Sequence, residues 1–140
     1  MIGISNDRLI HSLNVGRLME EISREKYNWD DQKCKEMFIL GCVHDIGYEF
    51  SELQEEHPNI GGLLLKNSNY KYWKEVYYHG KVTNEYESEE LNLLNIADMQ
   101  INSFGEKVTI DERIQDIAKR YGDYSRQYFD VVSLREKLKV

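Results

Sequence analysis

The stretch Gly41-Cys42-Val43-His44-Asp45-Ile46-Gly47 places an imidazole and a carboxylate side by side at the end of an apolar run. The residues before it, from Met37 onward, are mostly apolar and predict a buried helix, which we expect Gly47 to end in the left-handed conformation. Asp45 would then lie in the last turn, where the helix carbonyl groups already carry partial negative charge. A carboxylate in such surroundings needs a cation. A metal ion with His44 as a second ligand is the simplest choice.

The composition is that of an ordinary globular protein. The 140 residues suffice for one hydrophobic core and are too few for two, so we expect a single domain over residues 1–140. Apolar residues make up 41% of the chain and charged residues 31%. With one proline and nine glycines, apolar residues recur at the 3.6-residue period of helices almost throughout. The sequence therefore predicts an all-α, single-domain compact helical bundle of about six or seven helices.

Charge and hydropathy exclude several classes of partner. A net charge of -7 disfavours binding to a phosphate backbone, so we expect no long nucleic acid as partner. A small phosphorylated molecule stays compatible, because bound metal ions reverse the charge of an acidic site. Cys34 and Cys42 lack CxxC spacing and are interpreted as reduced thiols. Without a membrane-length apolar run or a signal-peptide core, we expect a cytoplasmic protein with no membrane partner. The oligomeric state stays open between monomer and homodimer.

Capping residues and periodicity predict where the helices lie. We expect them at about residues 6–25, 31–47, 57–65, 72–79, 87–100, 110–121 and 125–139, with a short extended pair within 103–108. The expected caps are Ser5 or Asn6, then Asp30, and capping boxes at Ser51–Gln54 and Thr109–Glu112. The expected inward residues are Ile10, Leu13, Leu18 and Ile22 in the first helix, and Tyr128, Val131, Val132 and Leu138 in the last. Gly61-Gly62 should let the third helix pack closely.

Residues with metal-ligating side chains lie on or at the ends of these predicted helices. They are His11, His44, Asp45, His57, His79 and Asp98. Like Asp45, Asp98 lies in an apolar segment and would need a positive partner if it faced inward. Taken singly, His11 could lie on an amphipathic face, His79 could favour a helix dipole and His57 could be a surface residue. Taken jointly, they predict one metal site, whose mixed ligands favour iron, manganese, cobalt, nickel or zinc over magnesium alone.

The order of these residues resembles that of a known superfamily. The matching segments are those around His11, Val43–Gly47, His57–Gly61, Tyr78–Gly80 and Ile96–Asp98. Together they are similar to the motifs of the HD-domain superfamily of metal-dependent phosphohydrolases, and most of all to its two-metal branch. The resemblance covers residues 11–98 and implies the helical fold of that superfamily. The helices expected within residues 109–139 would then pack against its C-terminal side.

The resemblance also implies how the metals are held. One ion would be bound by His11, His44, Asp45 and Asp98. Asp45 would bridge to a second ion held by His57 and His79, and water between the ions would be the nucleophile, which makes Asp45 and His44 central to catalysis. The gap from Asp45 to His57 is shorter than in that branch, so a one-metal form on the first four ligands stays open.

The activity implied by the resemblance is hydrolysis of a small nucleotide or related phosphate ester, with magnesium entering as a substrate-bound ion. Two alternatives remain. One is a mixed-valence di-iron HD-domain oxygenase on the same ligands. The other is a metal-containing nucleotide-binding or regulatory module without turnover.

Candidate substrate-binding residues lie close in sequence to the histidines. Arg8 and Asn14 lie one turn to either side of His11, and Lys81 follows His79, although solvated side chains are the alternative for the two basic residues. The aromatic residues within 70–78 are expected in the core, with nucleobase stacking as the alternative. Arg113, Lys119 and Arg120 either reach a phosphate or pair with Asp111 and Asp116, and we expect the pairing.

Overall fold

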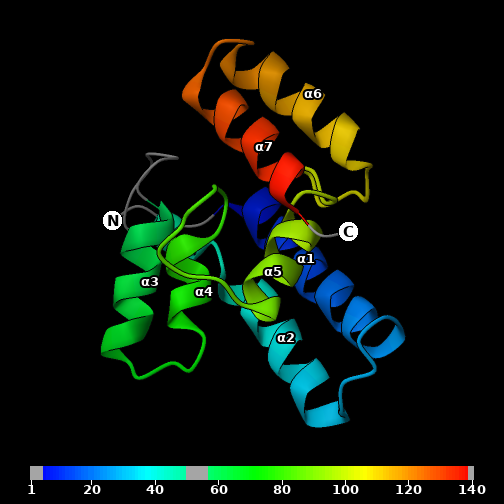
Figure 1. Cartoon of the computed structure of the whole chain (residues 1–140), viewed down its shortest axis with the longest axis vertical. Helices are drawn as coiled ribbons and strands as arrows, with labels where there is room; N and C mark the ends of the chain where they lie inside the picture. Colours follow the sequence, from blue (N-terminus) through cyan, green and yellow to red (C-terminus); the bar gives the residue numbers. More distant parts are fainter. Residues whose placement is uncertain (1–4, 50–56, 139–140) are drawn as a thin grey trace.

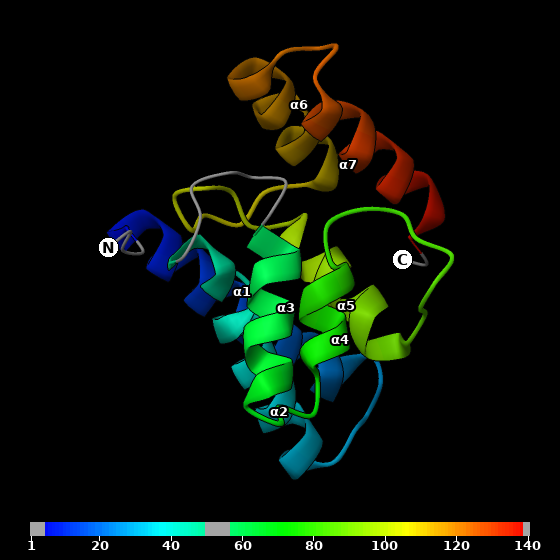
Figure 2. The same ribbon diagram turned by 90° about the vertical axis from the view of Figure 1, so that its left-hand side faces the viewer.

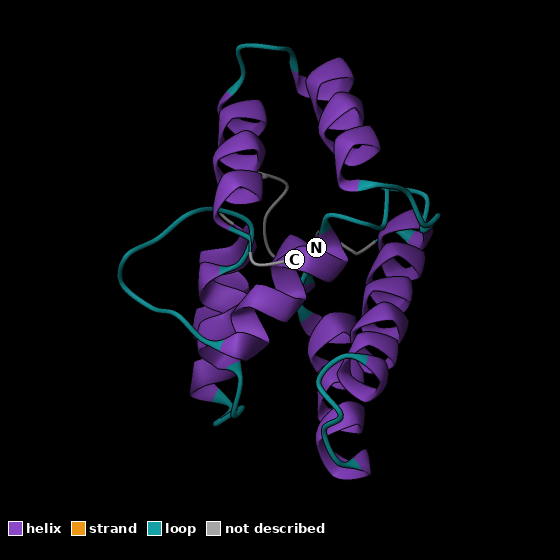
Figure 3. Cartoon of the chain, turned by 45° about the vertical axis from the view of Figure 1, so that its right-hand side comes forward, coloured by secondary structure: helices purple, strands orange, loops and turns teal. Residues whose placement is uncertain are grey.

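Seven α-helices and one short 3-10 helix form the part of the chain that the computed structural model describes, residues 5–49 and 57–138 (Figure 1). The elements are α1 (Asn6–Glu25), α2 (Asp31–Val43), η1 (Ile46–Glu49), α3 (His57–Asn67), α4 (Trp73–Tyr78), α5 (Glu89–Asp98), α6 (Ile110–Tyr121) and α7 (Arg126–Lys137). Within these residues there are helices and loops but no strand (Figure 3). Instead of an extended pair within residues 103–108, one isolated bridge joins Lys107 to Ile101, which lies before that range. The predicted all-α bundle is confirmed. No helix in the described ranges has the length and apolar character needed to span a bilayer.

The helix starts follow the capping residues in the sequence. The side chain of Ser5 accepts a hydrogen bond from the amide of Arg8, and that of Asp30 accepts one from Lys33. At α6, Thr109 and Glu112 cap each other reciprocally, as expected. These bonds satisfy amides that have no partner in the first turn of a helix. The capping box expected at Ser51–Gln54 lies outside the described residues.

The end of α2 differs from the prediction. The helix stops at Val43 instead of continuing to Gly47, which lies in η1 and is not among the glycines with positive φ. The reason for glycine there is space: a Cβ on Gly47 would lie 1.9 Å from the carbonyl oxygen of His57. Gly47 is therefore required by the close approach of η1 to α3. Asp45 lies in the turn between α2 and η1.

The glycine pair in α3 serves close packing on two sides, as predicted. A Cβ on Gly61 would lie 3.0 Å from the amide nitrogen of Gly47, and one on Gly62 would lie 2.5 Å from the Cβ of Tyr77. The backbone of α3 therefore fits directly between η1 and α4, and Figure 2 shows α3 and α4 side by side. This packing places His57, at the start of α3, beside His79, at the end of α4.

The main core lies between α1, α2, α4 and α5. Its buried members are Val15, Leu18, Met19, Met37, Leu40, Tyr72, Val76, Leu93, Leu94, Ala97 and Ile101. Of the residues expected to face inward from α1, Leu18 is buried and Ile22 packs against this core, whereas Ile10 and Leu13 are 46% and 37% exposed. The prediction is wrong for these two because the inward positions of the first turns belong to His11 and Val15. A polar residue occupies the place where the periodicity suggested an apolar one.

The hairpin of α6 and α7 has a smaller core of its own. Met99, Ile114 and Leu134 are buried there, so the end of α5 joins the two helices. The inner side predicted for α7 is confirmed, because Tyr128, Val131, Val132 and Leu138 pack against this cluster. In Figures 1 and 2 the hairpin lies across one end of the other helices.

Replacing Gly41 with alanine is expected to lower the free energy of unfolding by about 3 kcal/mol. A Cβ there would lie 2.4 Å from the Cα of Gly16 and 2.9 Å from the carbonyl carbon of Val15, so α1 and α2 would have to separate. Urea unfolding checks this, with Glu21→Ala on the exposed side of α1 as the control expected to change stability by less than about 0.5 kcal/mol. A loss below about 1 kcal/mol for Gly41→Ala would contradict the close backbone contact.

Candidate metal centre

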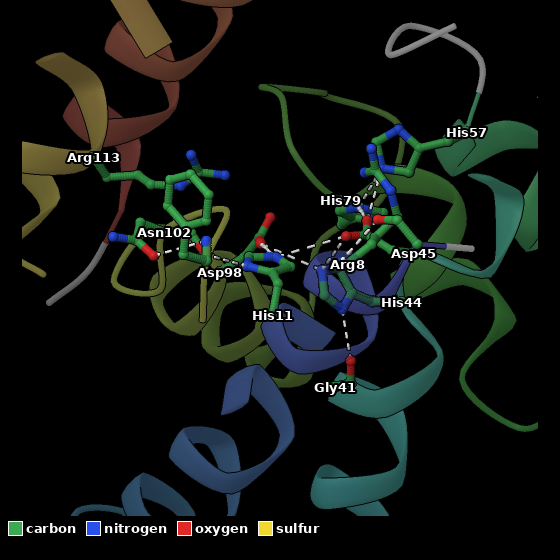
Figure 4. A network of polar contacts seen from close by, with 12 residues as sticks. Arg8, His11, Gly41, His44, Asp45, His57, His79, Asp98, Asn102 and Arg113 are labelled. Carbon is green, nitrogen blue, oxygen red and sulfur yellow. Dashed lines mark hydrogen bonds and ion pairs between the residues drawn. The ribbon is translucent and has the colours of Figure 1, made fainter. Parts of the chain in front are cut away.

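The six side chains singled out in the sequence converge between five α-helices (Figure 4). His11 comes from α1, His44 from the C-cap of α2, Asp45 from the turn that follows it, His57 from the start of α3, His79 from the end of α4 and Asp98 from the end of α5. The four histidines and Asp45 are each at most 6% exposed. Residues that are 87 positions apart in the chain, such as His11 and Asp98, are thereby in direct contact.

Four of these residues form a first group, which we call the four-ligand group: His11, His44, Asp45 and Asp98. Asp98 Oδ1 lies 2.9 Å from His11 Nε2 and 3.3 Å from His44 Nε2. Asp45 Oδ2 lies 3.6 Å from His11 Nε2 and 3.3 Å from His44 Nε2. Two imidazole nitrogens thus face two carboxylate oxygens across a short gap.

The other oxygen of Asp45 faces a second group, which we call the two-histidine group: His57 and His79. Asp45 Oδ1 lies 2.9 Å from His57 Nε2 and 3.5 Å from His79 Nε2. The two Nε2 atoms are 3.2 Å apart. Asp45 is therefore shared, with Oδ2 directed to the four-ligand group and Oδ1 to the two-histidine group.

Backbone carbonyl groups fix the orientation of three histidines. The Nδ1 atoms of His11, His44 and His79 lie 3.0, 2.6 and 2.6 Å from the carbonyl oxygens of Asn102, Gly41 and Val76 respectively. Because a carbonyl oxygen only accepts, Nδ1 donates the proton in each pair, and Nε2 is the nitrogen presented to the carboxylates. Histidines that bind metals in proteins are commonly held in this way.

The carboxylates are held in their charged form by the imidazoles around them. Burial opposes ionisation of Asp45, but the facing His44 and His57 keep its pKa well below the usual range. Burial likewise opposes ionisation of Asp98, and His44 and His11 keep the pKa of that carboxyl well below its usual range. Burial lowers the pKa of His44, yet the charges of Asp45 and Asp98 outweigh it and raise the pKa to about 9. The buried acids thus require positive charge, which either protons or metal ions can supply.

The donor set fits a divalent metal ion. Ligand atoms of His11, His44 and Asp98 all lie within 4.8 Å of one another, and so do those of His44, Asp45 and His79. Imidazole nitrogens and carboxylate oxygens are suitable ligands for transition metals and zinc. These buried clusters could therefore hold a metal ion.

A cavity of about 270 Å³ opens onto this centre. Arg8 and Lys81, two of the three candidate substrate-binding residues, line it, but Asn14 does not. The side chain of Asn14 instead donates a hydrogen bond to the carbonyl oxygen of Gly105 at 2.8 Å. Asn14 thereby ties α1 to the loop that follows α5.

Two arginines of α6 also line the cavity, although the sequence favoured ion pairs within the helix for them. Arg113 does contact Asp116, at 3.5 Å, but Arg120 donates a hydrogen bond to the side chain of Ser103 instead. Asp111 pairs with Arg135 of α7. Arg113 and Arg120 are seven residues apart, which places them on one face of the helix, but the spacing alone does not show what that face meets.

The aromatic residues within 70–78 lie away from this cavity and do not line it. Tyr72 is buried in the main core, and Tyr70 packs against that core. The ring of Tyr77 packs edge-on against those of Trp73 and Tyr78. Packing is therefore their role in the structure, as expected. Comparisons of the chain with protein-family models, curated proteins and solved structures find no match.

Proposed function

We propose that the protein is a metal-dependent phosphohydrolase of the HD-domain type, acting on a small nucleotide or related phosphate ester. The observation that carries the proposal is that the two oxygens of Asp45 face different pairs of histidines. Oδ2 lies 3.6 Å from His11 Nε2 and 3.3 Å from His44 Nε2. Oδ1 lies 2.9 Å from His57 Nε2 and 3.5 Å from His79 Nε2. A carboxylate shared in this way is suited to bridging two cations, whose mutual repulsion it partly neutralises. Pairs of ions of this kind serve in-line displacement at phosphorus in phosphatases and nucleases.

The roles of the chain's own residues follow from their geometry. His11, His44, Asp45 and Asp98 would hold one divalent ion, and Asp45, His57 and His79 the other. When bound, the ions supply an activated water near neutral pH and stabilise the negative charge that develops on the phosphoryl oxygens. The carbonyl groups of Gly41 and Val76 keep the imidazoles of His44 and His79 turned toward the centre. Arg8 and Lys81, which line the cavity, would neutralise the phosphate as it enters.

The basic lining supports a phosphorylated ligand over a neutral one. The cavity is lined by Arg8, Lys81, Arg113 and Arg120. Arginine and lysine at this density suit an anionic substrate, because each contributes charge-assisted hydrogen bonds to phosphate oxygens.

The test combines metal analysis with turnover. The protein is purified without oxygen, its iron, manganese, cobalt, nickel and zinc are quantified, and phosphate release from a nucleotide panel is measured alongside oxygen consumption. The proposal requires phosphate release that depends on bound metal. Oxygen consumption without phosphate release would establish the oxygenase, and nucleotide binding without either product would establish a regulatory module.

Bound metal is also expected to raise the melting temperature by about 8 °C at a metal concentration about 100 times its dissociation constant. The ion binds only where the folded chain gathers its ligands, so it stabilises the folded state by about 2.7 kcal/mol under that condition. Differential scanning calorimetry of the chelator-treated protein, with and without Mn²⁺, measures the shift. The same shift in the Asp45→Ala variant would contradict binding at this centre.

A further inference from the structure

Basic side chains gather in the cavity although the protein as a whole is acidic. Arg8 comes from α1, Lys81 follows α4, and Arg113 and Arg120 come from α6. Apart from the centre itself, the acidic residues of the lining are Asp7 and Asp130. Outside the centre the lining thus has four basic residues against two acidic ones, and in a chain with a net charge of -7 this local surplus indicates an anionic ligand.

Arg113 is the most unusual of these cations. Its side chain is only 17% exposed, and its Nε is buried without a hydrogen-bond acceptor among the described residues. The contact between its Nη1 and Asp116 Oδ2 is 3.5 Å, longer than the 2.7–2.9 Å usual for a charge-assisted hydrogen bond. Figure 4 shows Arg113 extending from α6 toward the side of the centre formed by His11 and Asp98. Burying a guanidinium with so few acceptors is unfavourable unless a ligand supplies them.

Arg120 lies on the same face of α6, two turns later. Its Nη2 donates a hydrogen bond to Ser103 Oγ at 2.7 Å. Ser103 directly follows Asn102, whose carbonyl oxygen accepts the hydrogen bond from His11 Nδ1. The loop that follows α5 therefore positions both the imidazole of His11 and the guanidinium of Arg120.

We propose that Arg113 and Arg120, the α6 wall of the cavity, bind a second phosphate group of the substrate. This inference rests on the proposed function for the position of the first phosphate, at the His and Asp centre. Guanidinium groups bind phosphate in a bidentate manner, which makes arginine well suited to recognising such a group. The cavity of about 270 Å³ lies near the lower limit for small-molecule sites, so both phosphates belong to one compact molecule.

Phosphonates allow binding to the α6 wall to be measured without hydrolysis. Their phosphorus is joined to carbon by a C–P bond, so there is no phosphate ester to cleave. Calorimetric titration of the Mn²⁺-loaded protein compares alkane-1,ω-bisphosphonates of two to five carbons with the monophosphonates of equal length. The best bisphosphonate is expected to bind at least tenfold more tightly than its monophosphonate. Arg113→Gln and Arg120→Gln should each reduce this ratio below threefold, and Arg113→Lys should give an intermediate ratio because it keeps the charge but loses the planar fork.

The control is Arg135→Gln, which removes the same charge from an exposed arginine that pairs with Asp111 and does not line the cavity. It should leave the ratio within twofold of the wild-type value. Equal affinity for bisphosphonates and monophosphonates would overturn the second phosphate site, even if the protein hydrolyses other esters. So would an affinity ratio that neither Arg113→Gln nor Arg120→Gln changes. An arginine-dependent preference in a protein that releases no phosphate from any substrate would support the site while refuting the hydrolase.

Discussion

Asp45→Ala is expected to remove bound metal and phosphohydrolase activity together. The variant deletes both oxygens that join the two groups. The four-ligand group loses one of its acids, and His57 and His79 lose the carboxylate that contacts them both. The imidazoles that remain would also face one another with less negative charge between them. We expect less than one-tenth of the wild-type metal content and a fall in kcat/KM of at least about 10³-fold, equivalent to about 4 kcal/mol of transition-state stabilisation.

Metal analysis by mass spectrometry and a phosphate-release assay on the same preparation check this prediction. Asp130→Ala is the matched control, because Asp130 also lines the cavity but lies outside the six-residue centre. Its metal content should equal that of the wild type. Activity that survives in Asp45→Ala after the metal has gone would refute the mechanism, since hydrolysis would then not need the centre.

The helical part of the fold could be predicted because its determinants are local. Ser5, Asp30 and Thr109 cap helices that begin where the sequence places them, since a side-chain acceptor and the amides it binds lie within a few residues. The glycine pair Gly61-Gly62 was likewise informative, because glycine within a helix has few purposes other than close packing.

The end of α2 could not be predicted from local signals. Gly47 follows an apolar helical segment and has the usual position of a C-terminal glycine, but glycine is needed there because the backbone of a residue ten positions later, His57, leaves no room for a Cβ. The exposure of Ile10 and Leu13 has a similar cause. His11 occupies the inward position of the first turns because it belongs to a polar centre. The periodicity of apolar residues does not reveal such a polar inward face.

The six residues of the centre could be found from the sequence because buried imidazoles and acids in apolar segments are costly without a shared partner. The α6 wall could not. Arg113 and Asp116 have ordinary helical spacing for an ion pair, and the sequence alone does not show that α6 faces the centre. Only the docking of the α6 and α7 hairpin through Met99 brings those arginines to the cavity.

His57→Ala and Asp98→Ala are expected to separate the two metal positions. His57→Ala leaves His11, His44, Asp45 and Asp98 in place, so one ion per chain should remain, and removal of the second should lower kcat by about 10²- to 10³-fold. Asp98→Ala instead removes an oxygen that lies 2.9 Å from His11 and 3.3 Å from His44. Asp45, His57 and His79 would still offer ligands to one ion.

Quantitative titration with Mn²⁺, followed by electron paramagnetic resonance, measures how many ions each variant binds and whether they are magnetically coupled. The wild type should bind two coupled ions, and each variant one uncoupled ion. The two variants should also differ in their affinity for Mn²⁺. His57→Ala keeps the four-ligand group, with two carboxylates and two imidazoles, whereas Asp98→Ala keeps one carboxylate together with His57 and His79. A wild type that binds a single ion, unaffected by His57→Ala but lost in Asp98→Ala, would establish the one-metal form, in which His57 and His79 only hold Asp45 in its charged state.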